Sequence, residues 1–266
     1  MVGRARAAAD RHARHDAGVL LEACLNGARR PPRHPALPVT PAQLVADAVA
    51  VASAGAGAVH LHVKDAHGAD TLDGAALGAV LEAVRAAVPG MPVGVTTGAW
   101  AAPDPADRLA AVAAWAALPD FASVNWHEPG AEDVAALLLD RGVGVEAGLW
   151  HVEAVESWRR WPDRDRCLRV LLELPARLDE TATGEAADAL LTGVGTGPGG
   201  RTGGGVPVLL HGAGSSAWPA VRHAGRRGVS TRIGLEDTLE LPDGSPAPDN
   251  AALVRAALAV LPGPAQ

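Results

Sequence analysis

The sequence predicts an α/β protein with a (β/α)8 barrel, or TIM barrel, fold. Eight short apolar runs recur along the 266 residues, and an alanine-rich helical stretch follows most of them. Polar residues gather where these runs end. The rival fold, an open doubly wound sheet, normally has a glycine-rich dinucleotide turn after its first strand, and LEACLNGARRP lacks one. We expect a flexible tail at 1–17 and a single barrel domain at 18–266.

The positions of the strands and helices follow from the spacing of apolar residues and from the residues that typically begin or end helices. The predicted strands are 19–25, 58–63, 93–98, 121–126, 143–150, 168–174, 207–211 and 232–236. The predicted helices are about 41–52, 73–84, 104–117, 134–139, 152–158, 185–191, 218–226 and 251–261. Thr40 before Pro41, Asp73, and Asp249 or Asn250 are natural N-caps. The glycine-rich stretch 193–205 lacks a P-loop ending and is interpreted as a flexible connector.

Composition excludes several classes of function. The net charge is -7 with no basic stripe, which disfavours a nucleic-acid partner. Cys24 and Cys167 lie far apart and indicate small buried residues in a reducing compartment. The N-terminal stretch has no apolar core before Val19, so we expect no secretory signal, no membrane span and a cytoplasmic location. With no tyrosine and one phenylalanine, Ala, Val and Leu must fill most of the core.

Two histidines stand one residue apart in the second predicted strand, AGAVHLHV. Residues i and i+2 of a strand point to the same face, so His60 and His62 face the barrel interior together. Two neutral imidazoles suit zinc or a similar divalent metal. Because strand eight of a closed barrel pairs with strand one, Glu236 can reach the same point and complete a set with an open coordination position. The alternative is that both histidines are satisfied core or surface residues.

The stretch RIGLEDT adds two charged candidates for the chemistry. Arg232 can stabilise an oxyanion beside a metal, and Asp237 can abstract a proton from carbon that the metal activates. The alternative is a structural ion pair from Arg232 to Asp237 or Glu236 that stabilises the barrel. The structural and catalytic interpretations are compatible.

Motifs along most of the chain resemble the β-keto acid cleavage enzyme family, whose founding activity is 3-keto-5-aminohexanoate cleavage. They are GVLLEACLNGAR, LPVTPAQL, AGAGAVHLHVKDAHG, VGVTTGAW, FASVNW, RIGLEDT and DNAALV. The resemblance implies a zinc-dependent (β/α)8 barrel, usually a homotetramer, that converts a β-keto acid and acetyl-CoA into acetoacetate and a new acyl-CoA. It implies that His60, His62 and Glu236 bind Zn²⁺ or another divalent metal and that Arg232 and Asp237 are catalytic. It further implies substrate contacts from Thr96, Thr97, Gly98, Ser123 and Asn125.

The chain departs from the family at several substrate positions. Arg29 stands where the founding enzyme has an acid that meets the substrate's amine, so an anionic or neutral β-keto acid is expected. The fifth strand offers one carboxylate, Glu146, where two are usual. The stretch 174–177 replaces a glycine pair, and the stretches 126–128 and 209–218 are also unusual for the family. These departures predict a divergent member with an intact metal end, and they leave the roles of His211 and Trp126 open.

Two other classes of function compete with this interpretation. One is a metal-dependent hydrolase of the amidohydrolase type, although such enzymes carry the His-x-His pair on their first strand. The other is a barrel that binds a metal or ligand without catalysis. Exchange of CoA esters, hydrolysis without CoA, or binding alone would separate the three.

Overall fold

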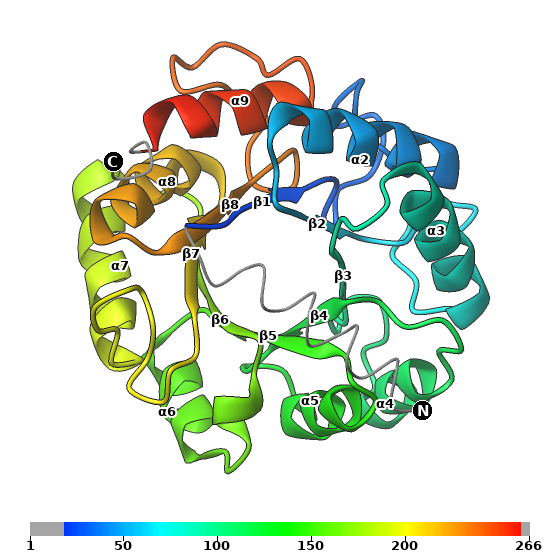
Figure 1. Ribbon diagram of the computed structural model, residues 1–266, viewed down its shortest axis with the longest axis horizontal. Helices are drawn as coiled ribbons and strands as arrows, with labels where there is room; N and C mark the ends of the chain where they lie inside the picture. Colours follow the sequence, from blue (N-terminus) through cyan, green and yellow to red (C-terminus); the bar gives the residue numbers. More distant parts are fainter. Residues whose placement is uncertain (1–18, 262–266) are drawn as a thin grey trace.

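The computed structural model describes residues 19–261, and the predicted tail at 1–17 lies outside them. Eight parallel strands pair in sequence order and close into a barrel, which confirms the predicted fold (Figure 1). The strands are β1 Leu21–Cys24, β2 Ala58–Leu61, β3 Val93–Thr96, β4 Phe121–Asn125, β5 Gly144–Leu149, β6 Arg169–Leu174, β7 Val208–Gly212 and β8 Ser230–Ile233.

The helices form a ring around the barrel (Figure 1). They are α2 Pro41–Ala54, α3 Gly74–Ala87, α4 Pro105–Ala113, α5 Ala131–Asp140, α6 Val152–Arg160, α7 Glu180–Gly193, α8 Ala217–Arg227 and α9 Asn250–Val260. Two short 3₁₀ turns, η1 Arg164–Arg166 and η2 Gly214–Ser216, precede β6 and α8. In this described part of the chain, no helix is both long and apolar enough to span a bilayer.

The predicted caps begin three of the helices. Thr40 and Gln43 form a capping box at the start of α2, with Pro41 at the first helical position. Asp73 accepts from the Ala76 N–H at the start of α3, and Asp249, not Asn250, caps α9. Asn250 instead becomes the first residue of α9.

Most strands end one to three residues earlier than predicted, and the differences in β2 and β8 fall at the candidate site. β2 ends at Leu61, so His62 lies just beyond the strand. β8 ends at Ile233, and the N–H groups of Asp237 and Thr238 turn back to the Gly234 carbonyl. A Cβ at position 234 would overlap the Cys24 carbonyl, so only glycine lets the chain turn this closely against β1. Glu236 and Asp237 therefore belong to a turn and not to the strand.

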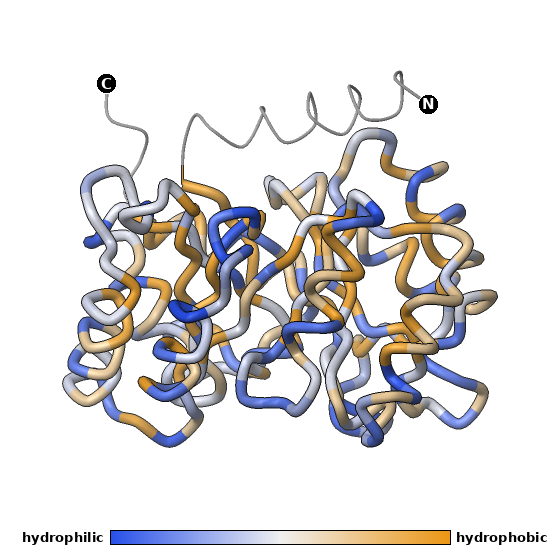
Figure 2. Tube along the Cα trace, turned by 90° about the horizontal axis from the view of Figure 1, so that it is seen from below, coloured by the Kyte–Doolittle hydropathy of each residue, from blue (hydrophilic) through white to orange (hydrophobic). Residues whose placement is uncertain are grey.

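The hydrophobic core lies between the strands and the helices. It consists mainly of buried Ala, Val and Leu, as the composition requires. In side view, hydrophobic stretches run through the body of the molecule, and much of the hydrophilic chain lies in loops at its edges (Figure 2). The interior of the barrel is different, because inward positions carry Phe121, Leu171 and several charged residues.

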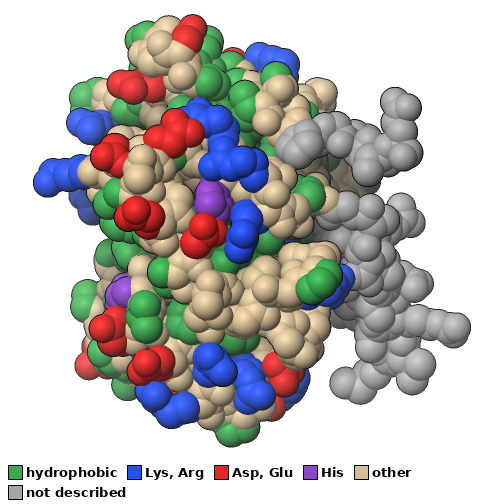
Figure 3. Space-filling model, turned by 90° about the vertical axis from the view of Figure 1, so that its left-hand side faces the viewer, with side chains coloured by type: hydrophobic (Ala, Val, Ile, Leu, Met, Phe, Trp, Pro, Cys, Tyr) green, Lys and Arg blue, Asp and Glu red, His purple; other side chains and the backbone are tan. Residues whose placement is uncertain are grey.

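Acidic and basic side chains alternate on the outer surface. On the face drawn in Figure 3 they lie side by side, without a single-sign stripe. Arg222 pairs with Glu180 at 3.0 Å, and His223 pairs with Asp188 at 2.9 Å, which links α7 to α8. The more exposed Arg222–Glu180 pair contributes about 0–1 kcal/mol to stability.

Candidate metal centre and active site

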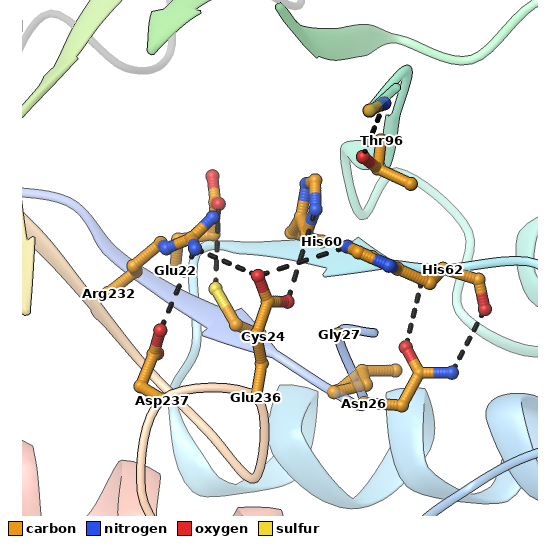
Figure 4. Close-up of polar contacts among 12 residues, drawn as sticks. Glu22, Cys24, Asn26, Gly27, His60, His62, Thr96, Arg232, Glu236 and Asp237 are labelled. Atoms are coloured by element: carbon orange, nitrogen blue, oxygen red, sulfur yellow. Dashed lines mark hydrogen bonds and ion pairs between the residues drawn. The ribbon is translucent and has the colours of Figure 1, made fainter. Parts of the chain in front are cut away.

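Three side chains converge at the carboxyl end of the barrel. His60 lies in β2, one residue before its end and paired with Cys24 of β1, and Glu236 approaches over β1 from the turn after β8 (Figure 4). The Nε2 atom of His60 lies 4.0 Å from Glu236 Oε2, and Nε2 of His62 lies 3.9 Å from Glu236 Oε1. One ligand atom from each residue lies within 4.8 Å of the others. The structure thus brings the predicted trio together.

The protonation of this trio suits a metal. Burial lowers the pKa of His60 to about 3, so its imidazole is neutral and keeps a lone pair for coordination. Burial alone would raise the pKa of Glu236, but Arg232, His62 and His60 outweigh it and hold that pKa below its usual range. Glu236 Oε2 is buried without a hydrogen-bond partner. The neutral His60 imidazole, the Nε2 atom of His62 and an ionised, unsatisfied carboxylate fit a divalent metal with an open position.

Asp70 fixes the orientation of His62, and sequence analysis missed it. Its Oδ2 lies 2.7 Å from His62 Nδ1 and accepts from Trp100 Nε1 at 2.6 Å, while Oδ1 pairs with buried Lys64. The Trp100 ring also stacks on His62 with an interplanar angle of 9°. A carboxylate on Nδ1 leaves Nε2 free for a metal. Nothing in the sequence spacing after the second strand singled out Asp70.

The Asn26-Gly27 turn after β1 contacts two members of the trio, His62 and Glu236. Asn26 Oδ1 accepts from the His62 N–H at 2.9 Å, and Asn26 Nδ2 donates to the His62 carbonyl at 2.9 Å (Figure 4). Gly27 has φ of 54°, and a Cβ there would overlap the Glu236 side chain. The turn needs glycine for both reasons, because it must pass directly beneath Glu236.

Arg232 and Asp237 lie beside the trio. The Arg232 Nη2 atom is 2.9 Å from Glu236 Oε1 and 3.6 Å from Asp237 Oδ1. Burial lowers the pKa of Arg232, but the surrounding thiol and carboxylates outweigh it, so the guanidinium stays charged. Asp237 Oδ2 is buried without a hydrogen-bond partner and is free to accept a proton. The predicted ion pairs are present, and the arrangement also leaves an acid–base group next to a cation.

His211, whose role the sequence left open, connects Asp237 to Glu173 on β6. Its Nδ1 lies 3.3 Å from Asp237 Oδ1, and its Nε2 lies 3.3 Å from Glu173 Oε2. Burial and Arg232 lower the pKa of His211, but Glu173 and Asp237 raise it to about 9 overall. The ring is therefore an imidazolium held between two carboxylates at neutral pH.

A cavity of about 270 Å³ opens over these groups. Of the predicted residues it is lined by His60, His62, Thr96, Ser123, Asn125, Arg232 and Glu236, together with Trp100, Trp150, Leu171 and Glu173. Trp150 Nε1 donates to Asn125 Oδ1 at 3.2 Å, and Asn125 also donates to Glu128. A larger cavity of about 670 Å³ opens at the other end of the barrel and contains none of the predicted site residues.

Four predicted substrate-binding residues lie outside the lining of the smaller cavity. Thr97 donates its hydroxyl to the Ser123 carbonyl at 2.8 Å, and Gly98 donates its N–H to Thr96 Oγ1 at 3.0 Å. These two shape the turn that presents Thr96. Arg29 donates through Nε to the Glu236 carbonyl at 3.2 Å and braces the metal-site turn from outside.

Glu146, the fourth, lies deeper in the barrel in a charged layer. It is fully buried, 2.7 Å from Arg169, whose guanidinium also lies 3.7 Å from Glu22. Burial, with the nearby Glu146 carboxylate, raises the pKa of Glu22 to about 8. Residues 22, 24 and 26 alternate along the first strand, so the sequence could have placed Glu22 inside the barrel with Cys24 and Asn26. The long-range contact between Glu22 and Arg169 leaves no mark in the neighbouring sequence.

Comparison with solved structures shows the same fold in ObcA. The complex of ObcA with oxaloacetate has a TM-score of 0.64 and 19% identity, covering 85% of this chain and 63% of that chain. A ternary complex of ObcA with a C4-CoA adduct and oxalate has a TM-score of 0.64 and 18% identity over the same shares. This chain thus spans less than two thirds of ObcA. Thiamine phosphate pyrophosphorylase from Pyrococcus furiosus has a TM-score of 0.51 and 14% identity, covering 91% of this chain and 95% of that chain.

The sequence comparisons gave two results. No curated protein matches the chain. Residues 18–262 match the family described as beta-keto acid cleavage enzyme, which covers nearly the whole sequence. With its barrel and its low identity to the solved structures, the chain is a divergent protein that belongs to the beta-keto acid cleavage enzyme family.

Proposed function

We propose that the protein condenses a β-keto acid with acetyl-CoA to give acetoacetate and a new acyl-CoA, with zinc or another divalent metal as cofactor. The observation that carries this proposal is the convergence of His60, His62 and Glu236 beside Arg232 and Asp237. Membership of the family supports it, as do the ObcA complexes with oxaloacetate and with a C4-CoA adduct. The proposed working form is a cytoplasmic homotetramer.

His60, His62 and Glu236 would hold the metal through two ring nitrogens and a carboxylate oxygen. When bound, a divalent metal would supply Lewis acidity that makes the carbon between the keto and carboxylate groups of a β-keto acid more acidic. Asp70 holds His62 in the required tautomer, and Asn26 holds the backbone of His62 on both sides. These contacts hold the metal-binding side chains in position before the metal and substrate bind.

Asp237 is the proposed base. Its free Oδ2 takes the proton from the activated carbon, and the electron pair of that C–H bond attacks the acetyl thioester. CoA leaves as the thiolate and then adds to the original keto carbon. Cleavage of the C–C bond releases acyl-CoA and the enolate of acetoacetate, and Asp237 returns the proton to that enolate. Base and acid are thus one residue, and the cycle closes without another reactant.

Arg232 stabilises the negative charge that forms on the carbonyl oxygens during both additions. Its guanidinium is buried and lines the cavity, where a fixed cation acts more strongly than it would in water. Its pairs with Glu236 and Asp237 keep it in place before substrate arrives. Thr96, Ser123 and Asn125 line the same cavity and are proposed to position the substrate through hydrogen bonds.

The test follows CoA-ester exchange on zinc-loaded protein, with a panel of β-keto acids and acetyl-CoA. We expect exchange in the wild type, loss of at least 100-fold in Asp237→Asn with bound zinc unchanged, and normal exchange in the surface control Asp133→Asn. Hydrolysis of substrate without CoA would instead indicate a metal-dependent hydrolase. Binding of metal and acid with neither reaction would indicate a non-catalytic barrel, and either result contradicts the proposal.

A further inference from the structure

The cavity has a far wall opposite the metal ligands. β2 and β6 are four strands apart in the ring of eight, so they face each other across the barrel. His60 and His62 mark one side of the cavity, and Glu173 on β6 lines the other. A β-keto acid whose keto and carboxylate groups lie at His60 and His62 therefore extends its tail toward β6. The residues on β6 meet the end of the substrate that does not react.

Glu173 presents a carboxylate at this wall. Its side chain is 16% exposed, and its ionic partner is His211, with Oε2 3.3 Å from His211 Nε2. His211 is shared with Asp237, so it neutralises only part of the charge of Glu173. Leu171, two residues earlier on the same strand face, supplies an apolar surface deeper in the cavity. This wall offers room for an alkyl chain followed by a hydrogen-bond acceptor.

The surroundings of Glu173 limit what can lie beside it. A second carboxylate on the substrate would face the Glu173 carboxylate directly, and two like charges at one buried wall repel each other. An ammonium there would lie next to the His211 ring, whose Nε2 is 3.3 Å from Glu173 Oε2 and which is already an imidazolium. An uncharged donor meets neither repulsion.

Building on the function proposed above, we propose that Glu173, held by His211, selects β-keto acids that carry one carboxylate and end in an uncharged hydrogen-bond donor such as a hydroxyl, and that it rejects dicarboxylates. The hydroxyl donates to the oxygen of Glu173 that His211 does not engage. Arg29, the other charged residue considered for selection, lies against the Glu236 carbonyl outside the cavity lining and does not reach this wall.

The test uses three acids of equal chain length that differ only at the terminal carbon: 3-oxohexanoate, 6-hydroxy-3-oxohexanoate and 3-oxohexanedioate. In the wild type we expect kcat/KM for the hydroxy acid to exceed that for the unsubstituted acid by about tenfold, as for a hydrogen bond to a charged acceptor. The dicarboxylate should be the poorest substrate. Glu173→Gln should raise the ratio of dicarboxylate to hydroxy acid by about tenfold or more, and the surface control Glu132→Gln should leave it unchanged.

Calorimetric binding of each acid to zinc-loaded wild type, without a CoA ester, gives a second measurement that needs neither turnover nor a folded variant. The hydroxy acid should bind most tightly and the dicarboxylate least. Exchange activity with an unchanged ranking in Glu173→Gln, or a dicarboxylate that binds as tightly as the hydroxy acid, overturns the selection. If no acid supports exchange but the binding order holds, the reaction proposed above fails while the selection stands.

Discussion

Replacement of Asp70 by asparagine tests whether the metal site depends on the group behind His62. Asp70 receives a hydrogen bond from Trp100, lies 2.7 Å from His62 Nδ1 and pairs with Lys64. Asparagine keeps the shape but has one acceptor oxygen and no charge. The contacts with His62 and Trp100 share Oδ2, and Lys64 pairs with Oδ1, so the single oxygen of asparagine replaces only one of these two acceptors. The amide NH2 group then faces either Lys64 or the N–H groups of His62 and Trp100, and in both orientations the negative charge behind His62 is lost.

The expected magnitude follows from this geometry. Loss of a carboxylate behind a metal-binding histidine costs about 10–100-fold in metal affinity, which corresponds to about 1.4–2.7 kcal/mol. Lys64 is buried and would keep only the Gly27 carbonyl as a partner. Removing one member of a buried ion pair costs about 3 kcal/mol, so the metal-free variant should also unfold at lower temperature.

A zinc titration against a competing chelator separates the two effects, provided that it is run well below the unfolding temperature of the metal-free variant. Circular dichroism should show the same folded spectrum for both proteins. Asp133→Asn on the outer face of α5 serves as the matched control. An Asp70→Asn protein that binds zinc as tightly as the wild type would refute the role assigned to Asp70 and, with it, the tautomer assigned to His62.

Three further predictions concern other parts of the molecule. His60→Ala should lose zinc while keeping its fold, and unchanged zinc content by metal analysis would exclude His60 as a ligand. Burial raises the pKa of Asp47 from 3.8 to about 6, so its contribution to stability is fully present below pH 3.8 and is lost as the pH rises through 6. Asp47→Asn should therefore be more stable than the wild type by about 1–2 kcal/mol at pH 8, after discounting for partial exposure, and denaturant unfolding at pH 8 and pH 4 should show this gain only at the higher pH. Arg29→Glu removes the donor to the Glu236 carbonyl, and because Arg29 lies outside the cavity lining, it should leave the order of preference among β-keto acids unchanged; a shift toward amine-bearing acids would show that Arg29 takes part in substrate recognition.

The order of strands and helices could be predicted because each leaves a local mark. Apolar runs, helical spacing and caps such as Thr40 and Asp73 depend only on neighbouring residues. Closure of the barrel then brought Glu236 to His60 across β1, which made one long-range contact predictable from topology. The predicted meeting of the two histidines with Glu236 therefore needed no knowledge of side-chain packing.

The remaining features of the site depend on contacts that no local pattern records. Asp70 reaches His62 only because the loop after β2 folds back on itself. Arg169 meets Glu22 and Glu146 from three different strands in the centre of the barrel. The early end of β8 depends on how closely Gly234 lies against Cys24. In each case the conformation depends on a residue that is close in space but distant in sequence, and one sequence alone does not reveal such a contact.

The distribution of indole rings gives the molecule its own optical signal. The chain has seven tryptophans and no tyrosine, so its near-ultraviolet emission comes almost entirely from indoles. Five of these rings are buried at 7% exposure or less, whereas Trp100 and Trp150 are 46% and 37% exposed at the cavity. Occupancy of the cavity should therefore change the emission of two rings above a constant background, and unlabelled protein can report ligand binding directly.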